Sequence, residues 1–439
     1  VAMAVTVETL EKLERKITLS LPLSAIQSEV ETRLKRLART VKMDGFRPGK
    51  VPMNVVSQRY GYSVQYEVLN DKVGEAFAQA ANEASLRVAG QPRITEKDGA
   101  PEGEVTFDAV FEVFPEVKIG DLASAEIEKL SAAVDDGAID KTVDILRKQR
   151  RSFAQRAMDA AAQDGDRVTV DFEGKLDGET FEGGKAEDFQ FLVGEGQMLK
   201  EFEDAVRGMK PGESKTFPLA FPEEYHGKDV AGKTADFLVT IKKIEAAHLP
   251  EVNDALAKSL GIADGTVAGL RADIKTNLER EVKFRLLARN KQAVMEALLS
   301  KAELDLPNAS VQGEIDRLKE GARADLKQRG VKDADKAEIP DDIFRAQAER
   351  RVRLGLVVAE LVKTNSLYAK PEQLKAHIDE LAASYEKPED VVRWYFGDRQ
   401  RLGEVEAVVI ENNVADFVLA QAKVTDKAMS FDELMAGQG

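Results

Sequence analysis

Hydrophobic and polar residues alternate in two different ways along the first 115 residues. At positions 5–7, 17–21 and 105–113 the alternation has a period of two, which predicts strands. A helical spacing of three or four residues is shown by Ile26, Val30, Leu34, Leu37 and Val41. A second helical stretch covers about residues 52–85. The order strand, helix, helix, strand predicts an N-terminal α+β domain over residues 1–115.

Residues 116–155 and 156–246 differ sharply in composition. The first segment is rich in alanine and charge, which predicts a connector that is helical near 139–153. The second holds eleven glycines between Gly165 and Gly232, and short alternating runs lie between them. Such runs, separated by glycine turns, predict a compact antiparallel sheet. A helical pattern at 198–209 interrupts it.

Residues 247–439 have helical periodicity almost throughout, and prolines separate the helices rather than break them. This pattern predicts an all-α C-terminal body. Trp394, Tyr395 and Phe396 are interpreted as an anchor that packs a helix into the core, with an exposed contact patch as the alternative. The chain as a whole is therefore predicted to be a multidomain α+β protein.

Composition excludes several kinds of chemistry. The 439 residues include no cysteine and only three histidines, so a disulfide scaffold, a thiol nucleophile and a histidine metal site are not expected. No apolar run is long enough for a membrane helix, and charged residues interrupt the first 21 positions, unlike a secretory signal. We therefore expect a cytoplasmic protein without membrane contact, metal or cofactor.

The charge of the chain is uneven. The net charge is −15, yet residues 31–50 alone carry +5. A basic segment on an acidic chain predicts one defined docking point for an anionic partner.

A literal match to the phosphate-binding loop occurs at Gly227-Lys228-Asp229-Val230-Ala231-Gly232-Lys233-Thr234. That motif binds phosphate only where a helix follows it. Here residues 235–241 alternate like a strand, so a turn between strands is the better interpretation. An NTP-driven activity, which would depend on this match alone, is not favoured.

A series of aromatic and glycine motifs runs through residues 170–237. In order they are Val170-Asp-Phe172-Glu-Gly174, Asp177-Gly178-Glu-Thr-Phe181-Glu-Gly183-Gly184, Phe189-Gln-Phe191-Leu-Val-Gly194, Phe202-Glu-Asp-Ala-Val-Arg-Gly208, Phe221-Pro-Glu-Glu-Tyr225 and Ala235-Asp-Phe237. Together they resemble FKBP-type peptidyl-prolyl isomerases. This resemblance implies a catalytic pocket formed by Phe172, Phe181, Glu182, Phe189, Met198, Leu199, Phe202, Tyr225 and Phe237. Two departures are Lys200-Glu201, where the family usually has Pro-Gly, and Phe202, where many members have Trp. They could change substrate preference or lower activity. From the pattern alone, the same residues could simply be the core of a small β-domain.

The turn after the basic helix carries a second resemblance. Gly45-Phe46-Arg47-Pro48-Gly49-Lys50 could be a plain helix–helix loop, but it places a phenylalanine between cations where the chain is expected to be exposed. It resembles the ribosome-docking signature of the bacterial trigger factor family. The order of segments, down to the closing residues 431–435, resembles that family from end to end.

The family resemblance implies an ATP-independent chaperone. It would dock at the large ribosomal subunit near the tunnel exit, on protein and ribosomal RNA, and bind nascent or unfolded chains while isomerising X–Pro bonds. In the family, residues like 116–155 join the C-terminal body, and roles extend to protein transport and cell division. A weak homodimer away from the ribosome is also implied. The alternative is a free-standing isomerase whose helices only oligomerise it.

Overall fold

The structure is a computed structural model that describes residues 6–437, and it separates into two compact units. The first unit combines the chain up to Leu130 with Ala288–Lys427. The second combines Ser131–Leu287 with the residues from Ala428 onward. Within residues 6–437, no helix has the length and apolar character needed to cross a membrane.

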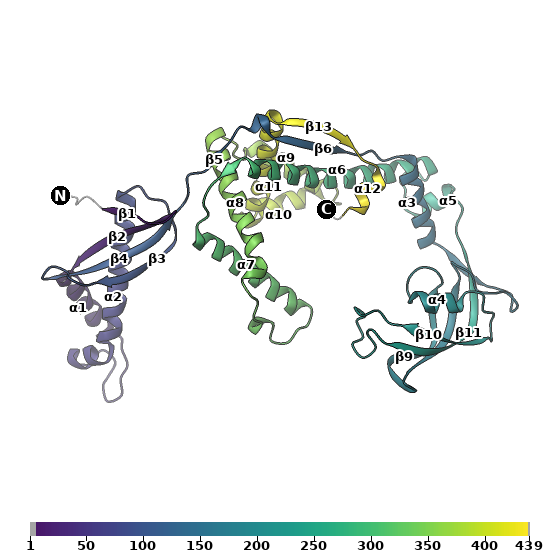
Figure 1. Ribbon diagram of the computed structural model, residues 1–439, viewed down its shortest axis with the longest axis horizontal. Helices are drawn as coiled ribbons and strands as arrows, with labels where there is room; N and C mark the ends of the chain where they lie inside the picture. The colour runs from purple at the N-terminus through teal and green to yellow at the C-terminus, as the bar shows by residue number, and fades with distance from the viewer. Residues whose placement is uncertain (1–5, 438–439) are drawn as a thin grey trace. The chain divides into compact units, whose positions relative to one another are not determined.

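The N-terminal part of the first unit is a four-stranded sheet packed against helices (Figure 1). Its antiparallel order is β1-β2-β4-β3. The elements are β1 (Val7–Thr9), β2 (Glu14–Pro22), α1 (Leu23–Ala38), α2 (Met53–Glu83), β3 (Val88–Lys97) and β4 (Glu104–Val113). Phe77 of α2 packs edge-on against Phe111 of β4, with ring centroids 4.9 Å apart. A second cluster, including Leu34 and Val56, holds α1 against α2.

The sequence prediction for this part was correct in its helices and incomplete in its strands. Both helices form within a few residues of the predicted positions. β3 was missed, so the predicted order of strand, helix, helix, strand was wrong. β3 contains Pro92 and a register shift between Ala89 and Arg93, which interrupt the alternation. The predicted strand residue Val5 lies outside the described residues.

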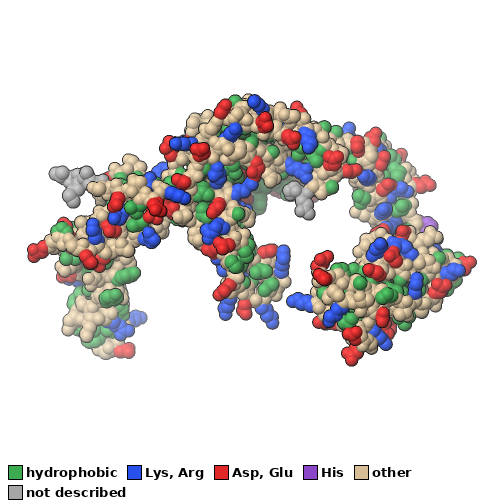
Figure 2. All heavy atoms as spheres, viewed as in Figure 1, with side chains coloured by type: hydrophobic (Ala, Val, Ile, Leu, Met, Phe, Trp, Pro, Cys, Tyr) green, Lys and Arg blue, Asp and Glu red, His purple; other side chains and the backbone are tan. Residues whose placement is uncertain are grey.

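Helices form the rest of the first unit. They are α7 (Asn308–Gln328), α8 (Asp342–Asn365), α9 (Pro371–Ala382), α10 (Pro388–Phe396) and α11 (Arg399–Gln421), with a short η2 (Ala334–Lys336). α6 (Val267–Ser300) contributes its last residues to this unit. Figure 2 shows acidic and basic side chains interspersed over this helical region.

The segment that follows β4 packs into the hydrophobic core of these helices. The segment consists of β5 (Lys118–Ile119), η1 (Leu122–Ser124) and β6 (Glu126–Ser131); β5 pairs with β12 (Ala302–Glu303), and β6 with β13 (Lys423–Ala428). Leu122 and Ile127 are buried in the same cluster as Leu298, Leu361 and Val418. Residues about 300 positions apart in sequence therefore share one hydrophobic core.

The interpretation of the 394–396 aromatic run as a core anchor was wrong for two of its three residues. Trp394 is 54% exposed and Phe396 48% exposed, and only Tyr395 packs against a buried cluster. The Arg401 guanidinium lies 4.0 Å from the centre of the Trp394 ring. This cation–π contact holds an indole at the surface without burying it.

The second unit contains a small helical core and a β-rich domain. In the helical core, α3 (Asp136–Gln149) packs through Ile139 and Val143 against α5 (Asp254–Ser259) and the first half of α6. Helix α12 (Phe431–Ala436) buries Leu434, and its Asp432 pairs with Lys141 of α3 at 3.0 Å.

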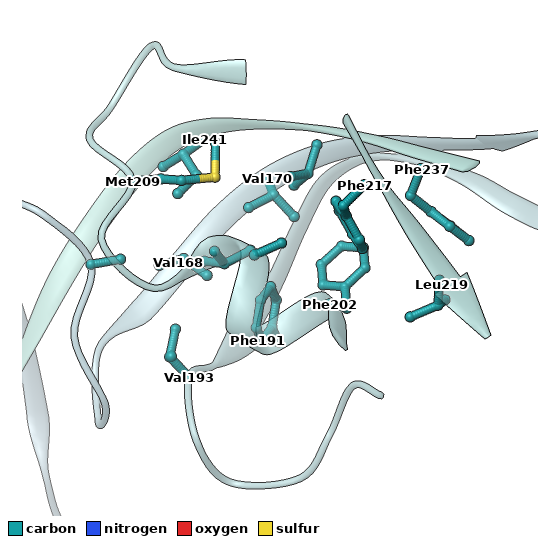
Figure 3. Close-up of a cluster of buried hydrophobic side chains, with 14 of the residues drawn as sticks. Val168, Val170, Phe191, Val193, Phe202, Met209, Phe217, Leu219, Phe237 and Ile241 are labelled. Carbon is teal, nitrogen blue, oxygen red and sulfur yellow. The ribbon is translucent and has the colours of Figure 1, made fainter. Parts of the chain in front are cut away.

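The β-rich domain is a five-stranded antiparallel sheet with one short helix. Its order is β10-β11-β8-β9, and β7 pairs with the far end of β11. The elements are β7 (Ser152–Gln155), β8 (Arg167–Leu176), β9 (Glu179–Leu192), α4 (Lys200–Val206), β10 (Ser214–Ala220) and β11 (Thr234–His248). Figure 3 shows α4 lying against the sheet, with the Phe202 ring between Phe191 and Phe217.

A buried carboxylate ties the strands together at the β7 end of β11. Glu245, 6% exposed, accepts two hydrogen bonds from Arg167 of β8, at 3.1 and 2.9 Å. The guanidinium also lies 4.2 Å from the ring centre of Phe153 on β7. The hydrogen bonds from Arg167 lower the pKa of Glu245 below its usual value, against the opposing effect of burial.

This pair is expected to make the stability of the β-rich domain depend on pH. Because the folded-state pKa of Glu245 is lowered, its stabilisation is present above the unfolded-state pKa of about 4.3 and is lost as pH falls through the folded value. Glu245→Gln should therefore lower the urea midpoint of the domain at pH 7, and the deficit should shrink toward pH 3. Methyl NMR signals of Val168 and Ile241 in the full chain would report the midpoint.

The exposed carboxylate Glu187 on β9 offers a matched control. Glu187→Gln should leave the midpoint unchanged at every pH. A deficit of the same size for Glu245→Gln at pH 7 and pH 3 would contradict the assignment.

Candidate functional site

A cavity of about 560 Å³ opens on the β-rich domain between the sheet and α4. Its wall combines aromatic and aliphatic side chains with a few polar ones at the rim. The lining residues are Phe172, Phe181, Glu182, Gly183, Gly196, Gln197, Met198, Leu199, Phe202, Leu219, Phe221, Tyr225, His226, Gly227, Lys228, Asp229, Val230 and Phe237. A mostly apolar cleft with a few polar groups is typical of a site for a small ligand or a short peptide segment.

Phe202 forms the floor of the cavity and belongs to the core at the same time. Its side chain is 1% exposed. Its ring centroid lies 5.4 Å from that of Phe172 and 6.0 Å from that of Phe237, both in edge-on geometry. On the other side it meets Phe217 at 5.5 Å. Edge-on contacts of this kind stabilise aromatic clusters beyond the burial of their area. The floor is therefore rigid.

Glycine at position 174 allows Phe237 to face the cavity. Gly174 on β8 lies opposite Phe237 on β11. A Cβ atom at position 174 would lie 2.5 Å from the tip of the Phe237 ring. Any larger residue would push this ring out of place. Steric exclusion therefore explains why the sequence motif has glycine at position 174.

The structure brings together eight of the nine residues predicted for the pocket. Phe172, Phe181, Glu182, Met198, Leu199, Phe202, Tyr225 and Phe237 all line the cavity. Phe189 does not. Its side chain is 37% exposed, and it meets the pocket only through the ring of Phe172, at 5.6 Å.

Sequence reasoning missed the wall formed by residues 226–230. His226, Lys228 and Asp229 bring polar and charged groups to the rim, and Val230 is buried beneath them. Lys228, Asp229 and Val230 belong to the phosphate-loop match, which was correctly interpreted as a turn. β11 begins at Thr234, the last residue of the match, so a strand and not a helix follows it. Phe221 was also missed, although its ring lies 4.8 Å from that of Tyr225.

A buried carboxylate on α4 holds the part of the cavity wall formed by residues 196–198. Glu203 follows the floor residue Phe202 and is 5% exposed. Its Oε1 accepts a hydrogen bond from the backbone N–H of Gly196, at 3.2 Å. Gly194 and Gly196 both have positive φ, +86° and +76°, so residues 194–196 form a tight turn that few other residues could adopt. Glu203 therefore joins the floor helix to the wall that carries Gln197 and Met198.

A second feature lies at the opposite end of the sequence, between α1 and α2. Lys50 N–H bonds to the Arg47 carbonyl at 2.9 Å, which closes a β-turn with Pro48 and Gly49 at its centre. Gly49 has φ +80°, as the third position of a type II turn requires. The base of the loop is fixed, because Val41 and Val51 on its two sides are buried. The basic loop, residues 42–50, is therefore an ordered projection.

The basic loop exposes one aromatic side chain among cations. Phe46 is 41% exposed. Lys42, Arg47 and Lys50 lie within five residues of it in sequence. Hydrophobic and basic side chains lie together at this end of the α1–α2 pair (Figure 2). An exposed ring beside positive charge suits a partner that offers both an apolar pocket and negative charge.

Comparison with known proteins agrees with the geometry of the cavity. Residues 158–242 match the family model of the FKBP-type peptidyl-prolyl cis-trans isomerase. The sheet, the short helix and the aromatic cavity thus define a domain of the prolyl isomerase class, and this domain makes the protein a peptidyl-prolyl isomerase. Residues 3–146 match the model of bacterial trigger factor protein, and residues 266–420 match that of its C-terminus.

Full-length relatives extend the match to the whole chain. A trigger factor of Paracidovorax citrulli is 88% identical over 437 residues, covering 100% of both chains. One of Acidovorax sp. (strain JS42) is 88% identical over 433 residues, 99% of each chain, and one of Variovorax paradoxus is 80% identical over 437 residues, 100% of each. The chain belongs to the bacterial trigger factor family. It is a molecular chaperone with an N-terminal ribosome-binding domain and a prolyl isomerase domain, and it binds ribosomes and nascent chains. The alternative of a free-standing isomerase is not supported.

Glu203 offers a test of how the cavity wall is positioned. Glu203→Ala should lower kcat/KM for a proline peptide by about 10- to 100-fold, because a hydrogen bond to a charged group contributes roughly 1.5–3 kcal/mol. Glu203→Gln retains an acceptor for the Gly196 N–H and should keep most of the activity. Amide NMR of residues 194–198 would show the loosened wall directly.

Glu187 on β9 is exposed and does not line the cavity, so Glu187→Ala is the control. Equal loss in Glu203→Ala and Glu203→Gln would show that the hydrogen bond to Gly196 is not what matters.

Proposed function

We propose that isomerisation takes place in the cavity on the β-rich domain. The acting residues would be Phe172, Phe181, Glu182, Met198, Leu199, Phe202, Tyr225 and Phe237, with Phe189 buttressing Phe172 from outside. The observation that carries this proposal is the aromatic lining of the cavity around a rigid Phe202 floor. Such a wall fits a prolyl ring and offers little to a planar, polar amide.

Catalysis then follows from the electronic nature of the peptide bond. Amide resonance keeps the bond planar, and rotation has a barrier of about 18–20 kcal/mol. The twisted amide has lost this resonance and with it much of its charge separation. An apolar cavity therefore binds the twisted form better than the planar one, which lowers the barrier without any proton transfer. Tyr225, which lines the cavity, would donate a hydrogen bond to the peptide carbonyl.

The basic loop is proposed as the part that docks near the tunnel exit of the large subunit. Its cations would meet ribosomal RNA, and Phe46 would enter an apolar pocket on a ribosomal protein. Support comes from the ordered turn that exposes Phe46 and from the +5 charge of residues 31–50 on a chain of net charge −15.

The remaining parts are proposed to divide the work. Residues 1–115 would dock, 156–246 would isomerise, and 247–439 would form the chaperone body, joined through 116–155. The packing of Leu122 and Ile127 into the helical core, and of Ile139 against α5 and α6, supports this role for the connector. Exposed aromatics such as Trp394 and Phe396 suit contact with unfolded chains without ATP. The protein would act in the cytoplasm, and its clients would include proteins destined for transport and proteins of cell division. Away from ribosomes it would form a weak homodimer.

The two activities should be separable by mutation. Phe202→Leu, which keeps an apolar side chain but removes the ring, should slow isomerisation of a proline peptide by more than about tenfold, because the floor is lost. Suppression of client aggregation by the same full-length variant should persist. Phe202→Ala should act similarly on catalysis but also destabilise the domain by roughly 3–5 kcal/mol.

NMR of the domain in the full chain would confirm that Phe202→Leu is folded. If aggregation suppression disappeared in a folded variant, the cavity itself would be the main client site and the proposed division would fail.

The docking loop can be tested with ribosomes. Phe46→Ala combined with Arg47→Ala and Pro48→Ala should abolish co-sedimentation and spare the fold, since the buried residues at the loop base are untouched. Binding of the wild type should weaken as salt rises, because contacts to RNA release counterions.

Lys332→Ala with Lys336→Ala removes two exposed cations between α7 and α8 and should have no effect. Wild-type co-sedimentation of the triple variant would refute this role of the loop.

A further inference from the structure

Two tyrosines on α2 are exposed without any structural need. Tyr62 is 85% exposed and Tyr66 61% exposed, one helical turn apart. With Arg59 and Ser63 they form one exposed stripe, which we call the Tyr62–Tyr66 face. The core of this part of α2 is made by other positions, among them Val56, Val64 and Val68. The face is therefore free for a partner.

The composition of this face differs from that of an ordinary solvent-exposed helix. Exposed helix positions usually carry Lys, Glu, Gln or Ala, because these residues favour the helix. From Met53 to Tyr66 the chain has no carboxylate, and Arg59 is the only charged side chain. The next acid, Glu67, is already paired with Arg33 at 3.3 Å. Aromatic rings, amides and hydroxyls thus meet the solvent without negative charge.

The face follows the basic segment of the domain directly in sequence. Residues 31–59 contain eight basic and two acidic side chains. Arg59 lies at the end of the face nearer in sequence to the basic loop, and its guanidinium is 5.8 Å from the Tyr60 ring centre. A partner that combines negative charge with flat rings would use both the basic segment and the two tyrosine rings. A nucleic acid has both features, whereas an acidic or neutral protein surface has no flat bases to stack on the rings.

We infer that the Tyr62–Tyr66 face binds unpaired bases of RNA. Side chains four residues apart on a helix have Cβ atoms about 5–6 Å apart, so the two rings can contact one base or two neighbouring bases. Single-stranded RNA is recognised by stacking on such rings, while arginine contacts the phosphates. This inference rests on the proposed function of the basic loop and extends it from a point contact to a strip along α2.

The test uses the full-length chain, purified ribosomes and an RNA hairpin whose single-stranded loop contains 2-aminopurine. Stacking on a tyrosine quenches 2-aminopurine fluorescence. Tyr62→Ala with Tyr66→Ala should weaken hairpin binding about 10- to 100-fold, in line with the loss of base stacking. Tyr62→Phe with Tyr66→Phe keeps the rings and should bind within about threefold of the wild type.

A control variant removes two other exposed tyrosines. Tyr368 is 58% exposed and Tyr385 60% exposed, both in the C-terminal helical region. Their double alanine variant should bind the hairpin like the wild type. Circular dichroism should show that all variants are folded, since none of the four side chains is buried.

Three results would overturn the inference. The first is unchanged hairpin binding and quenching in the Tyr62/Tyr66 alanine variant. The second is loss of ribosome binding with hairpin binding intact, which would assign the face to a ribosomal protein. The third is loss of self-association in sedimentation equilibrium with hairpin binding intact, which would assign it to a second copy of the chain.

The loop variant keeps this inference apart from the proposed function. If the Phe46 triple variant alone loses ribosomes, the proposed function stands and the RNA strip is wrong. If the tyrosine variant alone loses both ribosomes and hairpin, the strip stands and the role of the loop is wrong.

Discussion

The burial of one aromatic ring governs the isomerase domain. Phe202 is both the floor of the cavity and a central part of the domain core, in contact with rings from four strands of the sheet. Under the mechanism proposed above, a floor that is packed into the core would present a fixed apolar surface, which favours a twisted over a planar amide. The same coupling means that a substitution at this position can change the stability of the domain as well as the shape of the cavity, and truncation to alanine should cost the most stability.

The cavity, the basic loop and the C-terminal helices belong to parts of the chain that have separate hydrophobic cores. The sheet and α2, the C-terminal helices and the β-rich domain each bury their own hydrophobic cluster. Segments such as residues 117–127 nevertheless pack with helices near the end of the chain. The β-rich domain can therefore lie between these segments in the sequence while the core of the C-terminal helices stays intact, because that core is formed by residues before the domain and residues after it.

Local patterns in the sequence were informative where one period ran uninterrupted. The period of three to four residues predicted α1 and α2 closely, and alternation predicted β8 and β10. β3 was missed because a proline and a bulge break its alternation. β13, Lys423–Ala428, was missed because all six of its residues are exposed, so its sequence shows no alternation of hydrophobic and polar residues. The cavity residues were reached mainly through resemblance, since an aromatic core and an aromatic pocket look alike in sequence.

The sequence by itself determined the helices and strands whose periodicity is uninterrupted, the turn at Pro48-Gly49, the basic segment and the aromatic set around Phe202. These depend on spacing and on the intrinsic properties of a few neighbouring residues. Only the tertiary structure decided that Phe189 stands outside the cavity, that residues 226–230 form its wall, that Glu203 holds Gly196, and that Trp394 is exposed. Each of these depends on which distant segments meet, and packing between distant segments leaves no periodic trace in the chain.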